Sequence, residues 1–165
     1  MKRLDNEQSR SINYSGEIAE LEKFYDRQFD LIKKGNTDLV TLELVMLGKA
    51  LDFVHLTHRK LGISLDTSEK SVASLEEVID AFDRGVVQDN FFSAENGSIA
   101  ESVSAYLGIL IIANIGGKWE DTEQGAAVNV NGRLAFVSEY VEKRLLGLSQ
   151  LDAVTYFNSV SLARE

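Results

Sequence analysis

Apolar side chains recur every three or four residues along most of the chain, the spacing that places them on one face of an α-helix. Gly35 and Gly62 end the first two of these stretches, as glycines commonly end helices. The pattern predicts helices over residues 15–35, 39–61, 75–84, 98–115 and 138–147. A last helix is expected to start at Ser149 with Asp152 and to carry Leu151, Val154, Phe157 and Val160.

Several of these helices have a start signal. Ser74 with Glu77, and Ser98 with Glu101, have the spacing of a capping box, in which each side chain satisfies a backbone N–H of the first turn. Residues 36–38, Asn-Thr-Asp, are expected to start the second helix. Ser138 is expected to cap the helix over 138–147.

The helix over 98–115 is apolar on nearly every side, so we place it at the centre of the core. It stops at Gly116, where glycine accepts a left-handed conformation that costs other residues about 1 kcal/mol or more. Gly117 lets the chain leave in a new direction. Trp119 is expected to close a small sheet against the central helix. Gly116, Gly117 and Trp119 are therefore predicted to form a structural turn.

After this turn the hydrophobic period changes from helical to alternating, which predicts a three-stranded antiparallel meander over 118–137. Gln124-Gly125 and Asn131-Gly132 mark its turns, and Asn-Gly is the strongest short hairpin signal. A two-residue turn places Val130 opposite Arg133. Neither face of the meander is cleanly apolar, so the pattern leaves open which face packs inward.

Together these elements predict a mainly α-helical α+β fold with about six helices. A chain of 165 residues can bury enough surface to fold as a single domain over 1–165. Residues 1–14 lack periodicity and are expected to form a loose N-terminal tail. The chain has no cysteine, which excludes disulfides, thiolate metal sites and a cysteine nucleophile.

The first residues, MKRLDNEQSR, carry charges where a secretory signal has an apolar core, so we expect a cytoplasmic protein. The strongest membrane candidate, residues 106–115, has about half of the roughly 20 apolar residues that a spanning helix needs. We therefore expect no membrane partner.

The net charge is −9, and residues 66–123 contain three basic and twelve acidic side chains. An acidic surface repels nucleic acid and attracts basic proteins. The alternative is a solvated face that only keeps the protein soluble. We expect a non-enzymatic binding protein of immunity or regulatory type, with a basic protein partner, no nucleic acid and no cofactor. The expected contact residues are Glu76, Glu77, Asp80, Asp83, Phe91 and Phe92.

Phe91 and Phe92 are included because they interrupt a polar connector, residues 88–97. If exposed, adjacent aromatic rings bind partners well. The alternative is that both fold back onto the core.

An alternative function is a small metal- or histidine-dependent enzyme that uses Asp52, His55 and His58. Histidine and carboxylate are ligands of zinc and iron. However, Asp52 and His58 lie about 120° apart around one helix, so ligands from elsewhere would be required. His58 also falls on an apolar stripe, where a partly buried and hydrogen-bonded histidine is the simpler explanation.

The run Tyr106-Leu107-Gly108, then Gly116-Gly117-Lys118-Trp119 and a hairpin with Gly132, resembles a motif of small uncharacterised bacterial proteins. In those families a YLG helix leads through a GG-x-W turn into a short sheet. The resemblance covers about residues 98–160. Those families often carry an acidic residue directly after the YLG glycine, where this chain has Ile109. The resemblance implies a bacterial origin and this local fold, and it assigns no activity.

Overall fold

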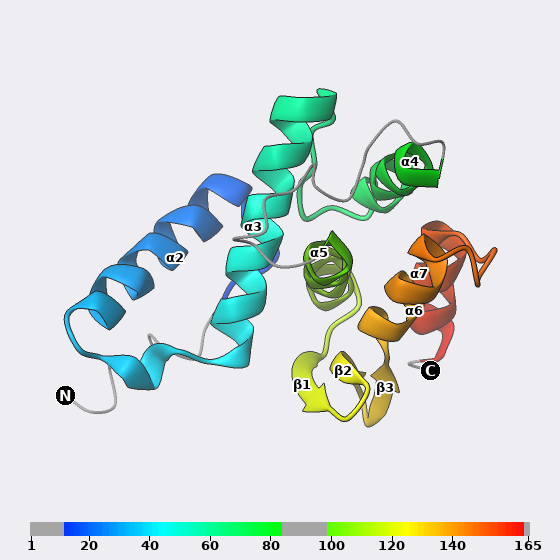
Figure 1. Cartoon of the computed structure of the whole chain (residues 1–165). Coiled ribbons are helices and arrows are strands. Elements are labelled where there is room, and N and C mark those ends of the chain that lie inside the picture. Colours follow the sequence, from blue (N-terminus) through cyan, green and yellow to red (C-terminus); the bar gives the residue numbers. More distant parts are fainter. Residues whose placement is uncertain (1–11, 84–98, 164–165) are drawn as a thin grey trace.

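The computed structural model describes residues 12–83 and 99–163. The mainly helical α+β fold is confirmed, because these residues form six α-helices, a short 3-10 helix and a three-stranded antiparallel sheet (Figure 1). The elements are α2 (Ile18–Lys33), η1 (Thr37–Leu39), α3 (Leu42–Leu61), α4 (Ser71–Asp83), α5 (Ile99–Asn114), β1 (Lys118–Thr122), β2 (Gly125–Val130), β3 (Arg133–Ala135), α6 (Val137–Leu145) and α7 (Ala153–Ala163).

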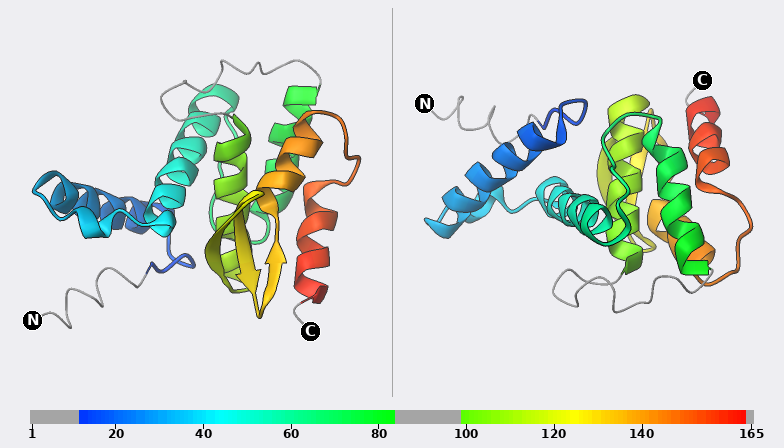
Figure 2. Two further views of the ribbon diagram at one scale, coloured as in Figure 1. Left: turned by 60° about the horizontal axis from the view of Figure 1, so that its bottom comes forward. Right: turned by 90° about the horizontal axis from the view of Figure 1, so that it is seen from above.

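Helix α5 lies at the centre, and the other elements are arranged around it. Helix α3 packs along one side of α5, whereas α4 and α6 pack on the other side (Figure 1). The sheet contacts α5 through β2, and α7 packs against α4. Helix α2 lies outside α3 and extends away from the rest of the molecule (Figure 2).

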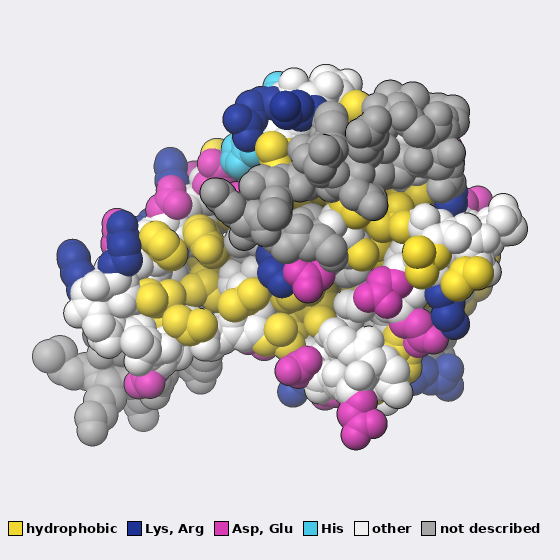
Figure 3. Space-filling model, in the orientation of Figure 1, with side chains coloured by type: hydrophobic (Ala, Val, Ile, Leu, Met, Phe, Trp, Pro, Cys, Tyr) yellow, Lys and Arg dark blue, Asp and Glu magenta, His cyan; other side chains and the backbone are white. Residues whose placement is uncertain are grey.

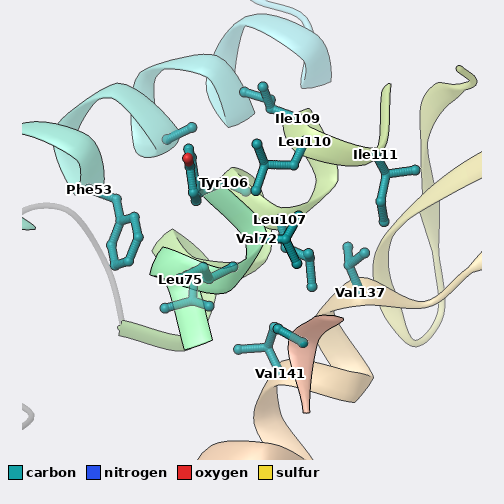
Figure 4. Close-up of a cluster of buried hydrophobic side chains, with 14 of the residues drawn as sticks. Phe53, Val72, Leu75, Tyr106, Leu107, Ile109, Leu110, Ile111, Val137 and Val141 are labelled. Carbon is teal, nitrogen blue, oxygen red and sulfur yellow. The ribbon is translucent and has the colours of Figure 1, made fainter. Parts of the chain in front are cut away.

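The central position of α5 follows from its composition. Apolar residues lie around most of the helix, so it has no continuous polar face to turn toward solvent. Eleven of its 16 residues are buried. Figure 4 shows Leu107 on the side that faces Val137 and Val141 of α6. Tyr106 lies toward α3, where its ring centroid is 5.6 Å from that of Phe53. Within the described ranges, no helix is long and apolar enough to cross a membrane.

The chain leaves α5 through two consecutive glycines. Gly116 and Gly117 have φ values of 116° and 111°, which residues with a side chain rarely adopt. Gly117 also lies against β2, since a Cβ there would come within 2.6 Å of the Asn129 carbonyl oxygen. Trp119 then packs on α5, where a Cβ at Gly108 would lie 2.0 Å from the indole ring. Gly108 and Gly117 thus leave the space in which the tryptophan and the sheet sit.

The sheet has the predicted order and register. Val130 pairs with Arg133 across the Asn131-Gly132 turn, in which both residues have positive φ. The cross-strand row of Trp119, Val128 and Ala135 is buried, so this row marks the inward face that the sequence pattern left open.

Helix α4 begins earlier than its capping box predicts. Its first residue is Ser71, so Ser74 lies within the helix and the prediction that Ser74 caps it is wrong. The Asp66 carboxylate organises the preceding turn, because it accepts hydrogen bonds from the Ser68 backbone N–H at 2.8 Å and the Ser71 hydroxyl at 2.8 Å. Ser98, the first residue of the other box, lies outside the described residues.

Two other helix starts differ from the prediction. Residues 37–39 form η1, and α3 starts later, where the Thr41 hydroxyl oxygen accepts the Leu44 N–H at 3.2 Å. Ser138 lies inside α6 and donates its hydroxyl to the Ala126 carbonyl at 3.1 Å, so it does not cap that helix. The Thr41 cap has ordinary local spacing, whereas the partner of Ser138 lies 12 residues earlier in β2, which local spacing does not reveal.

The last helix starts later than the predicted Ser149, because α7 begins at Ala153 and Asp152 rather than Ser149 caps it. The Asp152 carboxylate accepts the Thr155 N–H at 2.7 Å, directly before α7. Phe157 and Val160 are buried, whereas Leu151 precedes the helix and is exposed. The prediction that Leu151 belongs to the helix is therefore wrong.

Candidate functional site

The acidic side chains of α4 face the neighbouring helices as well as solvent. Arg144 of α6 donates from Nη2 to Glu76 at 2.8 Å and to Asp80 at 3.3 Å, with only 10% of its side chain exposed. The other carboxylate oxygen of Glu76 accepts the backbone N–H of Ala153, at 2.8 Å. This ion pair joins α4 to α6 and, through Ala153, to α7.

The predicted contact residues are therefore divided. Glu76 is mostly buried and is used within the fold, whereas Asp80 is about half exposed and shares Arg144. Glu77 is exposed to solvent. The side chain of Asp83, and the whole of Phe91 and Phe92, lie outside the described residues.

An exposed apolar surface lies between α2 and α3. Phe29, Val40 and Val45 are 45, 55 and 41% exposed. Figure 3 shows hydrophobic atoms gathered over α2, η1 and the adjoining part of α3. We define the α2–α3 apolar face as these three residues together with the half-buried Tyr25. Contiguous exposed apolar patches commonly mark interaction sites.

The aromatic part of this face is positioned by a glycine of α3. The Tyr25 ring lies so close to Gly48 that a Cβ there would be 2.8 Å from it. Tyr25 and Phe29 are stacked, with ring centroids 6.1 Å apart and an interplanar angle of 15°. The Lys33 ammonium lies 5.1 Å from the Phe29 ring centroid, a cation–π contact. Two aromatic rings are thus held side by side at the surface.

Carboxylates lie beside these rings. Burial of the Tyr25 hydroxyl, and then the charges of Asp52 and Asp26, raise the pKa of Tyr25. Partial burial also raises the pKa of Asp52, although the nearby His55 acts in the opposite direction. The two carboxylates place negative charge beside Tyr25, where a basic group of a partner is favoured, whereas Lys33 places positive charge over Phe29.

The histidines of α3 do not converge on a common site. His55 Nε2 lies 2.8 Å from a Glu22 carboxylate oxygen, and His58 Nδ1 lies 3.3 Å from the Ser64 hydroxyl. His58 is exposed, so its predicted partial burial is wrong, since Thr57 takes the buried position on that turn. Among residues 12–83 and 99–163, no group of three or more His, Asp or Glu side chains could hold a metal ion.

Sequence reasoning missed the role of Arg144 and the exposure of Phe29. A signal for Arg144 was present, because it falls three and four residues after the buried Val141 and Tyr140, on the inward stripe of α6. Phe29 belongs to an apolar stripe on α2, and this spacing predicts that its side chain faces inward. Its exposure depends on how little of α2 the neighbouring α3 covers, and no local pattern reports that.

Comparison of this chain with known protein families, with curated proteins and with solved structures finds no match.

Proposed function

We propose that this protein is a non-enzymatic factor that binds another protein through the α2–α3 apolar face. One observation carries the proposal: Phe29, Val40 and Val45 are 41 to 55% exposed on α2, directly after η1 and on α3, and the Phe29 ring stacks on Tyr25. Covering apolar surface is favourable by about 25 cal/mol per Å², before the cost of association is subtracted. Stacked aromatic rings are the kind of group that dominates binding energy at interfaces.

The charge distribution supports a basic partner. The chain carries a net charge of −9, and Asp26 and Asp52 lie beside Tyr25. A partner segment with apolar side chains and a lysine or arginine would bury its apolar groups on the face and place its cation near these carboxylates. Such opposite charges speed association and make it sensitive to salt.

The alternative enzyme has less support. His55 is engaged by Glu22 and His58 by Ser64, and they point to separate neighbours rather than to one reacting centre. Ligands or reacting groups from other elements would be needed to complete a site.

The test uses a partner captured by the wild-type protein and then purified, so that its Kd can be measured by calorimetry. Phe29→Ser/Val45→Ser is expected to weaken binding at least about tenfold, because truncating a central interface residue typically costs more than 1 kcal/mol. The Kd of the wild type is expected to rise with salt concentration.

The matched control is Leu146→Ser/Leu148→Ser, which removes two more exposed apolar side chains from the connection between α6 and α7. It is expected to leave the Kd unchanged. Binding that survives in Phe29→Ser/Val45→Ser, or is lost in the control instead, contradicts the proposed surface. Binding that salt does not weaken contradicts the basic partner.

A further inference from the structure

A cavity of about 380 Å³ lies between β3, α6 and α7. Small-molecule sites span roughly 300–1,000 Å³, so this volume falls at the lower end of their range. The cavity is on the opposite side of α5 from α2 (Figure 1), and it shares no residue with the α2–α3 apolar face. A ligand there would be bound independently of the proposed protein partner.

Arg133 lines this cavity from the inward face of β3. Ala135, two residues further along the strand, is buried in the inward row with Trp119 and Val128. Side chains two residues apart on a strand project from the same face, so Arg133 shares the inward face. Val130, its cross-strand neighbour, is 4% exposed and also lines the cavity. The guanidinium is therefore attached on the side of the sheet that faces the cavity.

The helices contribute an aromatic and apolar wall. Phe136, directly before α6, is four residues ahead of Tyr140, and both line the cavity. On α7, Tyr156 and Val160 are likewise four residues apart, so each pair lies on one side of its helix. The Tyr140 and Tyr156 rings are nearly parallel, with centroids 4.0 Å apart. The Tyr140 hydroxyl donates to the Leu151 carbonyl at 2.6 Å, so this part of the wall is fixed before any ligand binds.

The charged groups of the cavity leave one cation without a counterion. Lys143 Nζ lies 2.9 Å from a Glu139 carboxylate oxygen, so these two charges offset each other. Arg133 is exposed and has no ion pair with any described residue. Burial, and then the charge of Glu139, raise the pKa of Tyr156 to about 12, so this phenol is neutral at neutral pH. The cavity is thus net positive, although the whole chain carries a charge of −9.

We propose that this cavity binds a small carboxylate with an apolar body. The body packs on the tyrosine and phenylalanine wall, and the carboxylate pairs with Arg133 at the exposed edge. A guanidinium can hold a carboxylate through two parallel hydrogen bonds. A neutral ligand would gain only the apolar contacts, and an amine would be repelled by Arg133. The site goes beyond the proposed protein binding and does not rest on it.

An NMR titration measures both the affinity and the place of binding. Proton–nitrogen correlation spectra of the full-length protein are recorded with phenylacetate, octanoate, phenylacetamide, phenethylamine and acetate. We expect saturable shifts with phenylacetate and octanoate, centred on β3, α6 and α7. Phenylacetamide and phenethylamine are expected to bind about three- to tenfold more weakly, the range from an exposed ion pair to a doubly hydrogen-bonded one. Acetate, which has almost no apolar body, is expected to give no saturable shift.

Arg133→Gln tests the cation. It is expected to raise the Kd of phenylacetate about three- to tenfold and to leave the Kd of phenylacetamide unchanged. The matched control is Arg27→Gln, which removes an exposed arginine from α2 and is expected to change neither value. Equal weakening in the two variants would mean that phenylacetate responds to the overall charge of the protein and not to this cavity.

Ser159→Leu tests the hollow itself. Ser159 is exposed on α7 and lines the cavity, so a leucine there fills part of the volume without entering the core. The saturable shifts with phenylacetate and octanoate are expected to disappear. Asn158→Leu adds the same side chain at an exposed position of α7 that does not line the cavity, and it is expected to leave both Kd values unchanged. Unchanged binding in Ser159→Leu would place the ligand elsewhere.

Three further results would overturn the proposal. One is the absence of a saturable shift with phenylacetate and octanoate at millimolar concentration. Another is equal affinity for phenylacetate, phenylacetamide and phenethylamine. The third is a set of shifts confined to α2 and α3, which would assign the ligand to the α2–α3 apolar face.

Discussion

The helices on the two sides of α5 are attached to the core by different means. On one side, α4, α6 and α7 are joined by polar groups that turn inward. The Arg144 ion pair with Glu76 is mostly buried. The Tyr140 hydroxyl donates to the Leu151 carbonyl at 2.6 Å, and the Tyr140 ring stacks on Tyr156 with centroids 4.0 Å apart.

On the other side, α2 turns apolar groups outward. It buries Leu21 and Gln28, and it rests on α3 where the Tyr25 ring covers Gly48. Phe29, one turn after Tyr25, remains 45% exposed. Glu76 of α4 is thus used within the fold, whereas the amphipathic helix α2 leaves the apolar Phe29 at the surface.

The strongest test of this comparison removes the cation from the first side. Arg144→Ala leaves the Glu76 carboxylate mostly buried without its arginine, and breaking such a pair typically costs about 3–5 kcal/mol. We expect a loss of about 3 kcal/mol in the free energy of unfolding, because Asp80 is about half exposed and can be solvated. Urea denaturation followed by circular dichroism measures this loss.

Its control is Lys143→Ala, on the exposed face of the same helix. Lys143 pairs with Glu139 one turn earlier at 2.9 Å, and exposed pairs of this kind contribute about 0.3–0.5 kcal/mol. If both variants lose stability equally, the Arg144 pair does not hold the three helices together.

A second test concerns the attachment of α2. In Gly48→Ala the new Cβ would lie 2.8 Å from the Tyr25 ring, so the ring has to move and α2 loosens. Overpacking costs about 1–3 kcal/mol, and we expect the lower end because Tyr25 is only half buried. Hydrogen exchange is expected to accelerate in α2 and to stay unchanged in α5.

The double variant Tyr25→Ala/Gly48→Ala isolates the cause. Without the ring, alanine in place of a helical glycine is expected to stabilise α3 by up to about 1 kcal/mol relative to Tyr25→Ala alone. A loss of stability in that background would show that Tyr25 is not what Gly48 accommodates.

Much of the fold was predictable because the determining signals are local. The all-round apolar composition of α5, the two glycines after it and the Asn131-Gly132 turn each specify their element from a few residues. Two helix starts were mispredicted because Ser74, with its capping-box spacing to Glu77, and Ser138, with a side chain that often caps helices, both lie inside helices. The groups that decide these starts, such as the Asp66 carboxylate, lie outside the spacing that was considered.

The candidate site was less predictable, because it depends on which helices meet. The acidic residues of α4 are predicted to be a free surface, but Glu76 accepts a hydrogen bond from Arg144, which lies 68 residues further along the chain. The cavity between β3, α6 and α7 likewise joins Arg133 and Tyr156, which no single stretch of sequence contains. The hairpin pattern placed Arg133 opposite Val130 but could not reveal which helices lie beside it.

The smallest expected effects come from two aspartates with opposite surroundings. Partial burial raises the pKa of Asp52 beside Tyr25, whereas hydrogen bonds from Ser68 and Ser71 lower the pKa of Asp66 before α4. A raised folded-state pKa means that the ionised carboxylate disfavours folding at neutral pH. A lowered one means that the ionised carboxylate favours folding there.

Asp52→Asn is therefore expected to raise the free energy of unfolding at neutral pH, by no more than about 0.5 kcal/mol at so exposed a site. The gain disappears as the pH falls through the raised pKa toward the ordinary value of 3.8, because wild-type Asp52 then becomes neutral as well. Asp66→Asn is expected to lose stability at neutral pH, and its loss shrinks as the pH falls below 3.8. Urea titrations across this pH range measure the free energy of unfolding of both variants. If it changes with the same sign in Asp52→Asn and Asp66→Asn at neutral pH, the two carboxylates do not have opposite effects on folding.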